Sequence, residues 1–219
     1  MSAVPPRTPS APARPALRGW LHVAGAVALP ACSPILLLRC HNAASLAWTL
    51  CYLVGVEVML ATSAVFHRGN WSPGARRAWR RADHSAIFVA ITGSYLAVAG
   101  LTLHGTVRVA LIVAVAVGAA AGIVIRQLTI DTPRLVNTIP FVIVGWAAVA
   151  VLPQLYRGGG PACFALVLGA GLAYTLGAIG YGLKRPRLSP HVFGYHELFH
   201  AGTLLGASLT FWAIDLALR

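Results

Sequence analysis

Seven long apolar stretches, separated by short polar connections, make up most of this chain of 219 residues. Each stretch is close to the roughly 20 residues that a helix needs to cross the hydrocarbon core of a bilayer. Because the connections are short, neighbouring helices are expected to run antiparallel. The pattern therefore predicts an all-α fold, a bundle of seven transmembrane helices, at residues 20–38, 44–66, 84–103, 109–125, 135–153, 161–183 and 192–218.

The composition indicates a membrane protein and argues against a soluble one. Apolar residues make up 58% of the chain and charged residues only 10%, whereas soluble domains carry about 25% charged residues. The four cysteines form no close pair of the C-x-x-C type, so neither a disulfide scaffold nor a cysteine metal site is expected. We therefore expect a multi-pass protein of the plasma membrane.

The net charge of +12 raises the question of a nucleic-acid partner. Such an interface would need its basic residues on one folded face, together with base-reading or stacking side chains. Here the basic residues lie in the short connections between apolar stretches, where Lys and Arg set the orientation in the membrane instead. No nucleic-acid partner is therefore expected.

The distribution of the basic residues predicts that orientation. In a seven-helix arrangement the N-terminal tail and the second, fourth and sixth connections share one side, which holds 13 of the 17 Lys and Arg residues. The other side holds the remaining 4. The positive-inside rule then places the N-terminus in the cytoplasm and the C-terminus outside. Residues 1–17, rich in proline, are predicted to be a disordered cytoplasmic tail, and residues 18–219 the membrane domain.

Two pairs of polar residues occur at helical spacing within the apolar stretches. His196 and His200 are one helical turn apart, so both imidazoles lie on the same helix face and can bind one metal ion. Ser63 and His67 have the same spacing at the end of the second stretch. Ionisable groups inside a membrane are energetically costly and indicate a functional site by default.

The predicted orientation brings these segments to a similar depth. The second stretch ends at the cytoplasmic face with His67, and both the third stretch, with Asp83, and the seventh begin there. Three histidines with one open position are typical of a catalytic zinc site. We therefore expect His67, His196 and His200 to bind Zn²⁺. Asp83 is then placed to hold and deprotonate the fourth, water ligand, and Ser63 to donate to that water or to orient His67.

The remaining polar residues have simpler interpretations. A lone histidine in a transmembrane stretch usually makes a hydrogen bond within the packing, which fits His22 and His104 best. Glu197 directly follows the first histidine of the pair, so on a helix it points about 100° away from the ligand face, towards a neighbouring helix or the cytoplasmic mouth. The basic residues from Arg68 to Arg81 are explained more simply by topology and by anionic inner-leaflet lipids than by a substrate clamp.

Three segments carry a resemblance to a known family. They are Ser63-x-x-x-His67, the stretch RRADHSAI at residues 80–87 and the stretch GYHELFH at residues 194–200. Together they resemble the haemolysin III family of the progestin and adipoQ receptor superfamily, over everything after the proline-rich tail. The resemblance implies a seven-helix bundle with its N-terminus inside. It also implies zinc held by His67, His196 and His200, with Asp83 beside the metal-bound water. Ser63 then lies next to these groups without binding the ion itself.

One segment departs from the family pattern. The family usually has Gly-Thr-Tyr-Thr-Pro after the aspartate, whereas residues 93–97 read GSYLA here. Because proline kinks a helix, its loss at Ala97 is expected to straighten the third helix. The departure changes none of the expected metal ligands.

The resemblance suggests a zinc-dependent membrane hydrolase that acts on an amide or ester of a lipid, as in ceramidase-like proteins. Two alternatives stay open. His196-Glu197-x-x-His200 matches the H-E-x-x-H motif, in which the glutamate is the general base of a metalloprotease. An intramembrane protease would leave Ser63, His67 and Asp83 without a role. Alternatively, the zinc is structural, and the protein is a membrane sensor or regulator, or a cytolysin.

Overall fold

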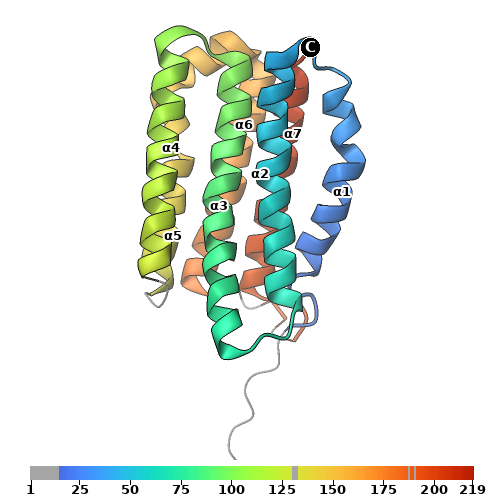
Figure 1. Cartoon of the computed structure of the whole chain (residues 1–219), viewed down its shortest axis with the longest axis vertical. Coiled ribbons are helices and arrows are strands. Elements are labelled where there is room, and N and C mark those ends of the chain that lie inside the picture. Colours follow the sequence, from blue (N-terminus) through green and yellow to red (C-terminus); the bar gives the residue numbers. More distant parts are fainter. Residues whose placement is uncertain (1–14, 130–132, 187, 190) are drawn as a thin grey trace, which may run out of the picture.

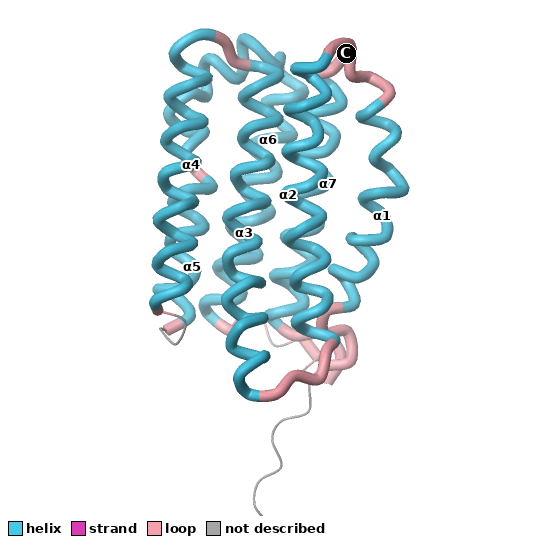
Figure 2. Tube along the Cα trace, viewed as in Figure 1, coloured by secondary structure: helices cyan, strands magenta, loops and turns pink. Residues whose placement is uncertain are grey.

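The computed structural model describes residues 15–129, 133–186, 188–189 and 191–219, and this part of the chain is almost entirely helical. The helices lie side by side along the long axis of the molecule (Figure 1), and most of the connections lie at its two ends (Figure 2). The elements are α1 (Trp20–Leu37), α2 (Ala43–Arg68), α3 (Pro73–Thr102), α4 (Gly105–Leu128), α5 (Arg134–Gly145), the 3₁₀ helix η1 (Ala147–Val151), α6 (Leu152–Leu183) and α7 (Tyr195–Ala217).

Five segments of the described chain are long and apolar enough to cross a membrane. They are Trp20–Leu37, Ala43–Arg68, Pro73–Thr102, Gly105–Leu128 and Thr138–Leu183. This finding confirms the all-α class and a multi-pass integral membrane protein. Residues 1–14 of the predicted tail and the acidic residue Asp131 lie outside the described residues.

The fifth expected stretch, residues 135–153, is not one helix. Helix α5 ends at Gly145, η1 follows, and α6 begins at Leu152. The hydroxyl of Tyr95 on α3 donates to the Gly145 carbonyl at 2.7 Å and accepts the Ala148 N–H at 2.9 Å. A side chain from another helix thus pairs with backbone groups at the break, which a pattern within residues 135–153 cannot indicate.

Helix α6 contains a second interruption. Gly160 has φ 76° and ψ 172°, outside the helical region, and Pro161 follows it. Glycine adopts a positive φ without the steric cost that a side chain brings. The sixth expected stretch, residues 161–183, begins directly after this kink.

Helix α3 starts earlier than hydrophobicity indicates. Its first residue is Pro73, and the Ser72 side chain caps it by accepting the Ala75 N–H at 3.3 Å. The expected third stretch therefore begins inside this helix, because residues 73–82, which include four arginines, are helical as well. At its other end α3 runs without interruption through Ala97, as expected from the missing proline.

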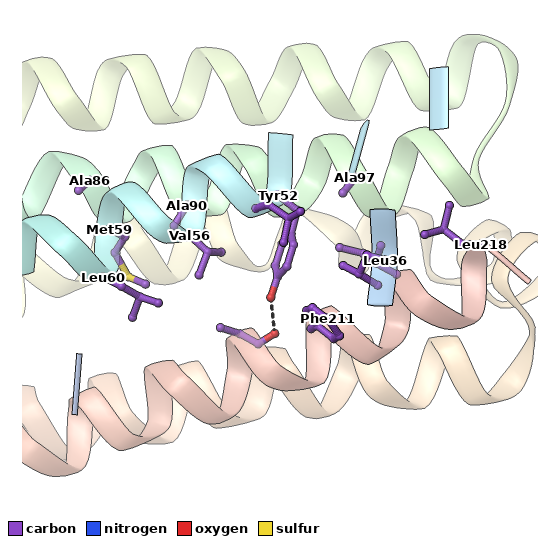
Figure 3. Packing of buried hydrophobic residues seen from close by; sticks show 13 residues of the cluster. Leu36, Tyr52, Val56, Met59, Leu60, Ala86, Ala90, Ala97, Phe211 and Leu218 are labelled. Atoms are coloured by element: carbon purple, nitrogen blue, oxygen red, sulfur yellow. Dashed lines mark hydrogen bonds between the residues drawn. The ribbon is translucent and has the colours of Figure 1, made fainter. Parts of the chain in front are cut away.

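The main core joins α2 and α3 to α7 (Figure 3). Tyr52, at its centre, donates a hydrogen bond to the Ala207 carbonyl oxygen on α7 at 2.7 Å, and its ring makes an edge contact with Phe211. Ala86, Ala90 and Ala97 supply the α3 side of this cluster. Small residues at such contacts let transmembrane helices approach closely. The outward faces of α2, α4 and α6 carry exposed aliphatic side chains, as expected for a surface that faces lipid.

Candidate metal centre

Three histidines from two helices meet at one end of the bundle. His67 lies in the last turn of α2, and His196 and His200 lie in the first turns of α7. Their candidate ligand atoms all lie within 4.8 Å of one another, and the Nε2 atoms of His67 and His196 are 3.2 Å apart. The one-turn spacing on α7 puts both of its imidazoles on the face towards α2. These three side chains are close enough together to share one metal ion.

Ser63 and Asp83 lie beside this cluster. Both side chains are buried, with 3% and 9% of their surface exposed, and the Ser63 hydroxyl donates a hydrogen bond to the Asp83 carboxyl group. Ser63 is one turn before His67 on α2, and Asp83 faces it from α3. The structure thus brings together all five residues that the sequence singled out, at the end of the bundle where α2 ends and α3 and α7 begin.

The five residues line a single cavity of about 200 Å³. Its wall continues from this polar end along α3, from Asp83 to Leu103, a separation of about 30 Å at 1.5 Å per residue. Leu111 of α4 and Leu155 of α6 line the cavity as well. The cavity is therefore long, narrow and mostly apolar, with its histidines and its carboxylate concentrated at one end.

His22 is a fourth histidine of this site, which the sequence interpretation missed. It is 3% exposed and lines the same cavity. Its ring stacks on that of His200, with centroids 3.8 Å apart and planes only 4° from parallel. Since α1 begins at this end of the bundle, the depth argument used for the other histidines also applied to His22. The prediction that His104 is packed between helices is wrong, because this residue is exposed at the start of α4.

Glu197 is directed away from the three histidines. It is 1% exposed, accepts the Gly194 N–H at 2.8 Å and forms an ion pair with Nε of Arg18. This agrees with the helical rotation predicted for it. A protease of the H-E-x-x-H type would need this carboxylate free to act as a base, so the geometry disfavours that alternative.

The basic residues from Arg68 to Arg81 surround the same end of the bundle. Arg68 lies over the Trp20 ring, 4.5 Å from its centroid, and Arg76 lies 5.6 Å from the centroid of the Phe66 ring. Arg68, Arg76 and Arg77 are exposed. None of these three side chains lines the cavity, so this basic group and the histidine cluster are neighbouring but separate features.

Two other carboxylates on the described helices lie outside the cavity. Asp215, at the opposite end, pairs with Arg39 at 2.8 Å and Arg219 at 2.7 Å, and therefore belongs to a structural contact. Glu57 is half-buried on α2. Neither residue is among those that line the cavity.

Comparison with known proteins identifies the family. The sequence profile of the family described as "Haemolysin-III related" matches residues 11–211. The chain is 30% identical over 132 residues to the Hemolysin-3 homolog of Bacillus subtilis (strain 168), covering 60% of this chain and 59% of that protein. It is 25% identical over 176 residues to Hemolysin-3 of Bacillus cereus, covering 80% and 77%. The extent of the profile match shows that this chain belongs to the haemolysin III family.

Proposed function

We propose that this protein holds one zinc ion between His67, His196 and His200, and that it hydrolyses an amide or ester bond of a membrane lipid. The observation that carries the proposal is the position of the three imidazoles. They lie at the polar end of a long apolar cavity, beside the hydrogen-bonded pair of Ser63 and Asp83. A lipid chain fits the apolar part of such a cavity, which leaves its polar linkage at the histidines.

The donor set suits zinc. Imidazole nitrogens bind Zn²⁺ at 2.0–2.1 Å, so two such ligands of a tetrahedral ion are about 3.3 Å apart. The Nε2 atoms of His67 and His196 are 3.2 Å apart. Catalytic zinc sites have three protein ligands and a fourth, open position, and three histidines match that count.

The neighbouring side chains have roles that follow from their contacts. When bound, the ion supplies a water of lowered pKa and polarises a carbonyl oxygen. The Asp83 carboxylate would hold that water and take up its proton, and the Ser63 hydroxyl, which donates to the same carboxyl group, would orient the carboxylate. The apolar walls contributed by α3 and α6 bind the lipid chain and exclude bulk water.

We also propose that the chain crosses the membrane seven times, with its N-terminus in the cytoplasm. The segment Thr138–Leu183 has 46 residues, about 70 Å as one helix, whereas the hydrocarbon core is about 30 Å thick. The breaks at Gly145 and Gly160 allow it to cross twice. The charge distribution then puts the histidine site in the inner leaflet of the plasma membrane, where the basic residues from Arg68 to Arg81 attract anionic lipids.

A non-enzymatic role is the second candidate. The relatives in two Bacillus species carry the name hemolysin-3, which supports a cytolysin. In that case the ion would be structural and would join α2 to α7, the two helices that supply its ligands.

The test measures zinc content and hydrolysis in the same preparations. Full-length protein purified in detergent is expected to contain close to one zinc per chain, and His200→Ala is expected to lose it. Asp83→Asn should keep most of the zinc but lose hydrolysis of fluorescent lipid amides and esters in proteoliposomes. Glu57→Gln, which neutralises a carboxylate of α2 outside the cavity lining, is the matched control and should leave both unchanged.

Each outcome separates the candidates. Full zinc occupancy in His200→Ala would refute the ligand assignment. Zinc binding without hydrolysis of any lipid amide or ester, together with zinc-dependent thermal stability, would favour the structural ion. Cleavage of a transmembrane peptide in place of a lipid, lost in Glu197→Gln under conditions where that variant is fully loaded with zinc, would support the protease.

A further inference from the structure

The segment that precedes α1 runs along the segment that precedes α7. The Ala16 N–H donates to the His191 carbonyl oxygen at 2.8 Å, and the Leu17 N–H donates to that of Val192 at 3.2 Å. These two bonds bring residues 15–19 to the end of the bundle that holds the three histidines. The start of α1 therefore lies beside α2 and α7 at the metal centre.

An ion pair secures this arrangement. Nε of Arg18 contacts Oε1 of Glu197, whose other oxygen, Oε2, accepts the Gly194 N–H at the start of α7. Glu197 is 1% exposed, and the Arg18 side chain is about a quarter exposed. Charge-assisted hydrogen bonds of this kind are about twice as strong as neutral ones. Glu197 lies between two of the proposed ligands in sequence, so a contact that holds Glu197 also holds the first turn of α7.

The same segment contacts the third proposed ligand. Gly19 has φ 82°, and a Cβ atom placed on it would lie 2.8 Å from Cβ of His67. A side chain is therefore excluded both by the backbone conformation and by the neighbouring histidine. The next residue, Trp20, lies under the guanidinium of Arg68 on α2.

His22 reaches the remaining ligand by stacking rather than by coordination. A metal ion lies in the plane of the imidazole that binds it, because the nitrogen lone pair lies in that plane. The His22 and His200 rings are parallel to within 4° and their centroids are 3.8 Å apart. Two rings in this arrangement cannot both direct a lone pair at one ion 2.0–2.1 Å away. His22 instead supports one face of the His200 ring.

We infer that residues 15–22 form a latch that positions the three ligands. Arg18 and Glu197 close the latch, Gly19 packs on His67, and His22 restrains the ring of His200. Arg18, Glu197 and His22 are positioning residues, which act on the ion through its ligands. The inference rests on the proposed metal site but not on the proposed hydrolysis.

The test is zinc affinity, measured on full-length protein in detergent by competition with a chromophoric chelator. Arg18→Gln and Glu197→Gln should each weaken zinc binding by about 10–100-fold, as is usual for residues that orient metal ligands. The double variant should bind zinc with about the same affinity as the single variant that binds it less tightly, because both substitutions break the same contact. Arg39→Gln, which removes a partner of Asp215 at the other end of the bundle, is the matched control. It should lower the unfolding temperature without changing zinc affinity.

His22 gives an independent readout. His22→Phe keeps a flat ring against His200 and should retain affinity close to that of the unmodified protein, whereas His22→Ala should lose affinity. If His22→Phe were as weak as His22→Ala, His22 would be a ligand and the latch would be refuted. Unchanged affinity in Arg18→Gln, or additive losses in the double variant, would also refute it.

If Glu197→Gln does not fold, Arg18→Gln tests the same contact from its partly exposed side. An unmodified protein without zinc would overturn the metal site itself, which distinguishes that failure from failure of the latch.

Discussion

Replacement of Gly93 by alanine tests the closest approach of two helices that carry the candidate site. A Cβ atom on Gly93 of α3 would lie 2.2 Å from the carbonyl oxygen of Cys51 on α2, and ordinary contact begins at 3.4 Å. The Cβ atom would therefore be about 1.2 Å too close to this oxygen. Because the oxygen belongs to the backbone, no side-chain rotation can relieve the clash. Helices α2 and α3 must therefore move apart.

The expected cost follows from overpacking. Extra methyl groups in a well-packed core cost about 1–3 kcal/mol. In a chain of 150–250 residues each kcal/mol lowers the unfolding temperature by about 2–4 °C, so Gly93→Ala is expected to lower it by about 2–12 °C. Thermal unfolding of the purified protein in detergent, followed by circular dichroism, measures this shift.

Gly74→Ala is the matched control for this experiment. Gly74 is also on α3, and a Cβ atom there would have no atom within 4 Å outside its chain neighbours and the local helix backbone. Since alanine favours a helix by up to about 1 kcal/mol over glycine, this variant should unfold at the same temperature or slightly higher. Equal unfolding temperatures for the two variants would show that α2 and α3 do not approach as closely as the reasoning requires.

Three further predictions concern topology, packing and the metal. Reporter fusions should place the N-terminus in the cytoplasm and the C-terminus outside, and both ends on one side would contradict seven crossings. Tyr52→Phe removes the hydrogen bond to Ala207 and should cost about 0.6 kcal/mol in thermal unfolding, with about 1.7 as the upper bound for such bonds; a larger loss would mean that the substitution disturbs more than this bond. Chelation of zinc should lower the unfolding temperature of the unmodified protein but not that of His200→Ala, since an ion at 100 times its Kd stabilises the fold by about 2.7 kcal/mol. An unmodified protein that unfolds at the same temperature with and without chelator would argue against a bound ion.

Much of this site was predictable because its signals are local. The one-turn spacing of His196 and His200 places both on one helix face wherever that helix lies. The end of one apolar stretch at His67 and the start of another near Asp83 needed only alternating helix directions to become neighbours. Hydrophobicity therefore determined the helical class, the approximate extent of most helices and the end of the bundle where the five polar residues meet.

The tertiary structure decided the contacts that depend on how the helices are rotated and on which distant parts of the sequence lie next to each other. The break after Gly145 uses a hydroxyl from Tyr95, which is 50 residues away, and no local pattern records such a partner. The ion pair of Arg18 with Glu197 joins residues 179 positions apart, and the stacking of His22 on His200 depends on the rotation of α1 against α7. Apolar periodicity determines which residues prefer to be buried, because burial depends on each side chain. It does not determine which buried side chains touch, because that depends on the packing of the whole bundle.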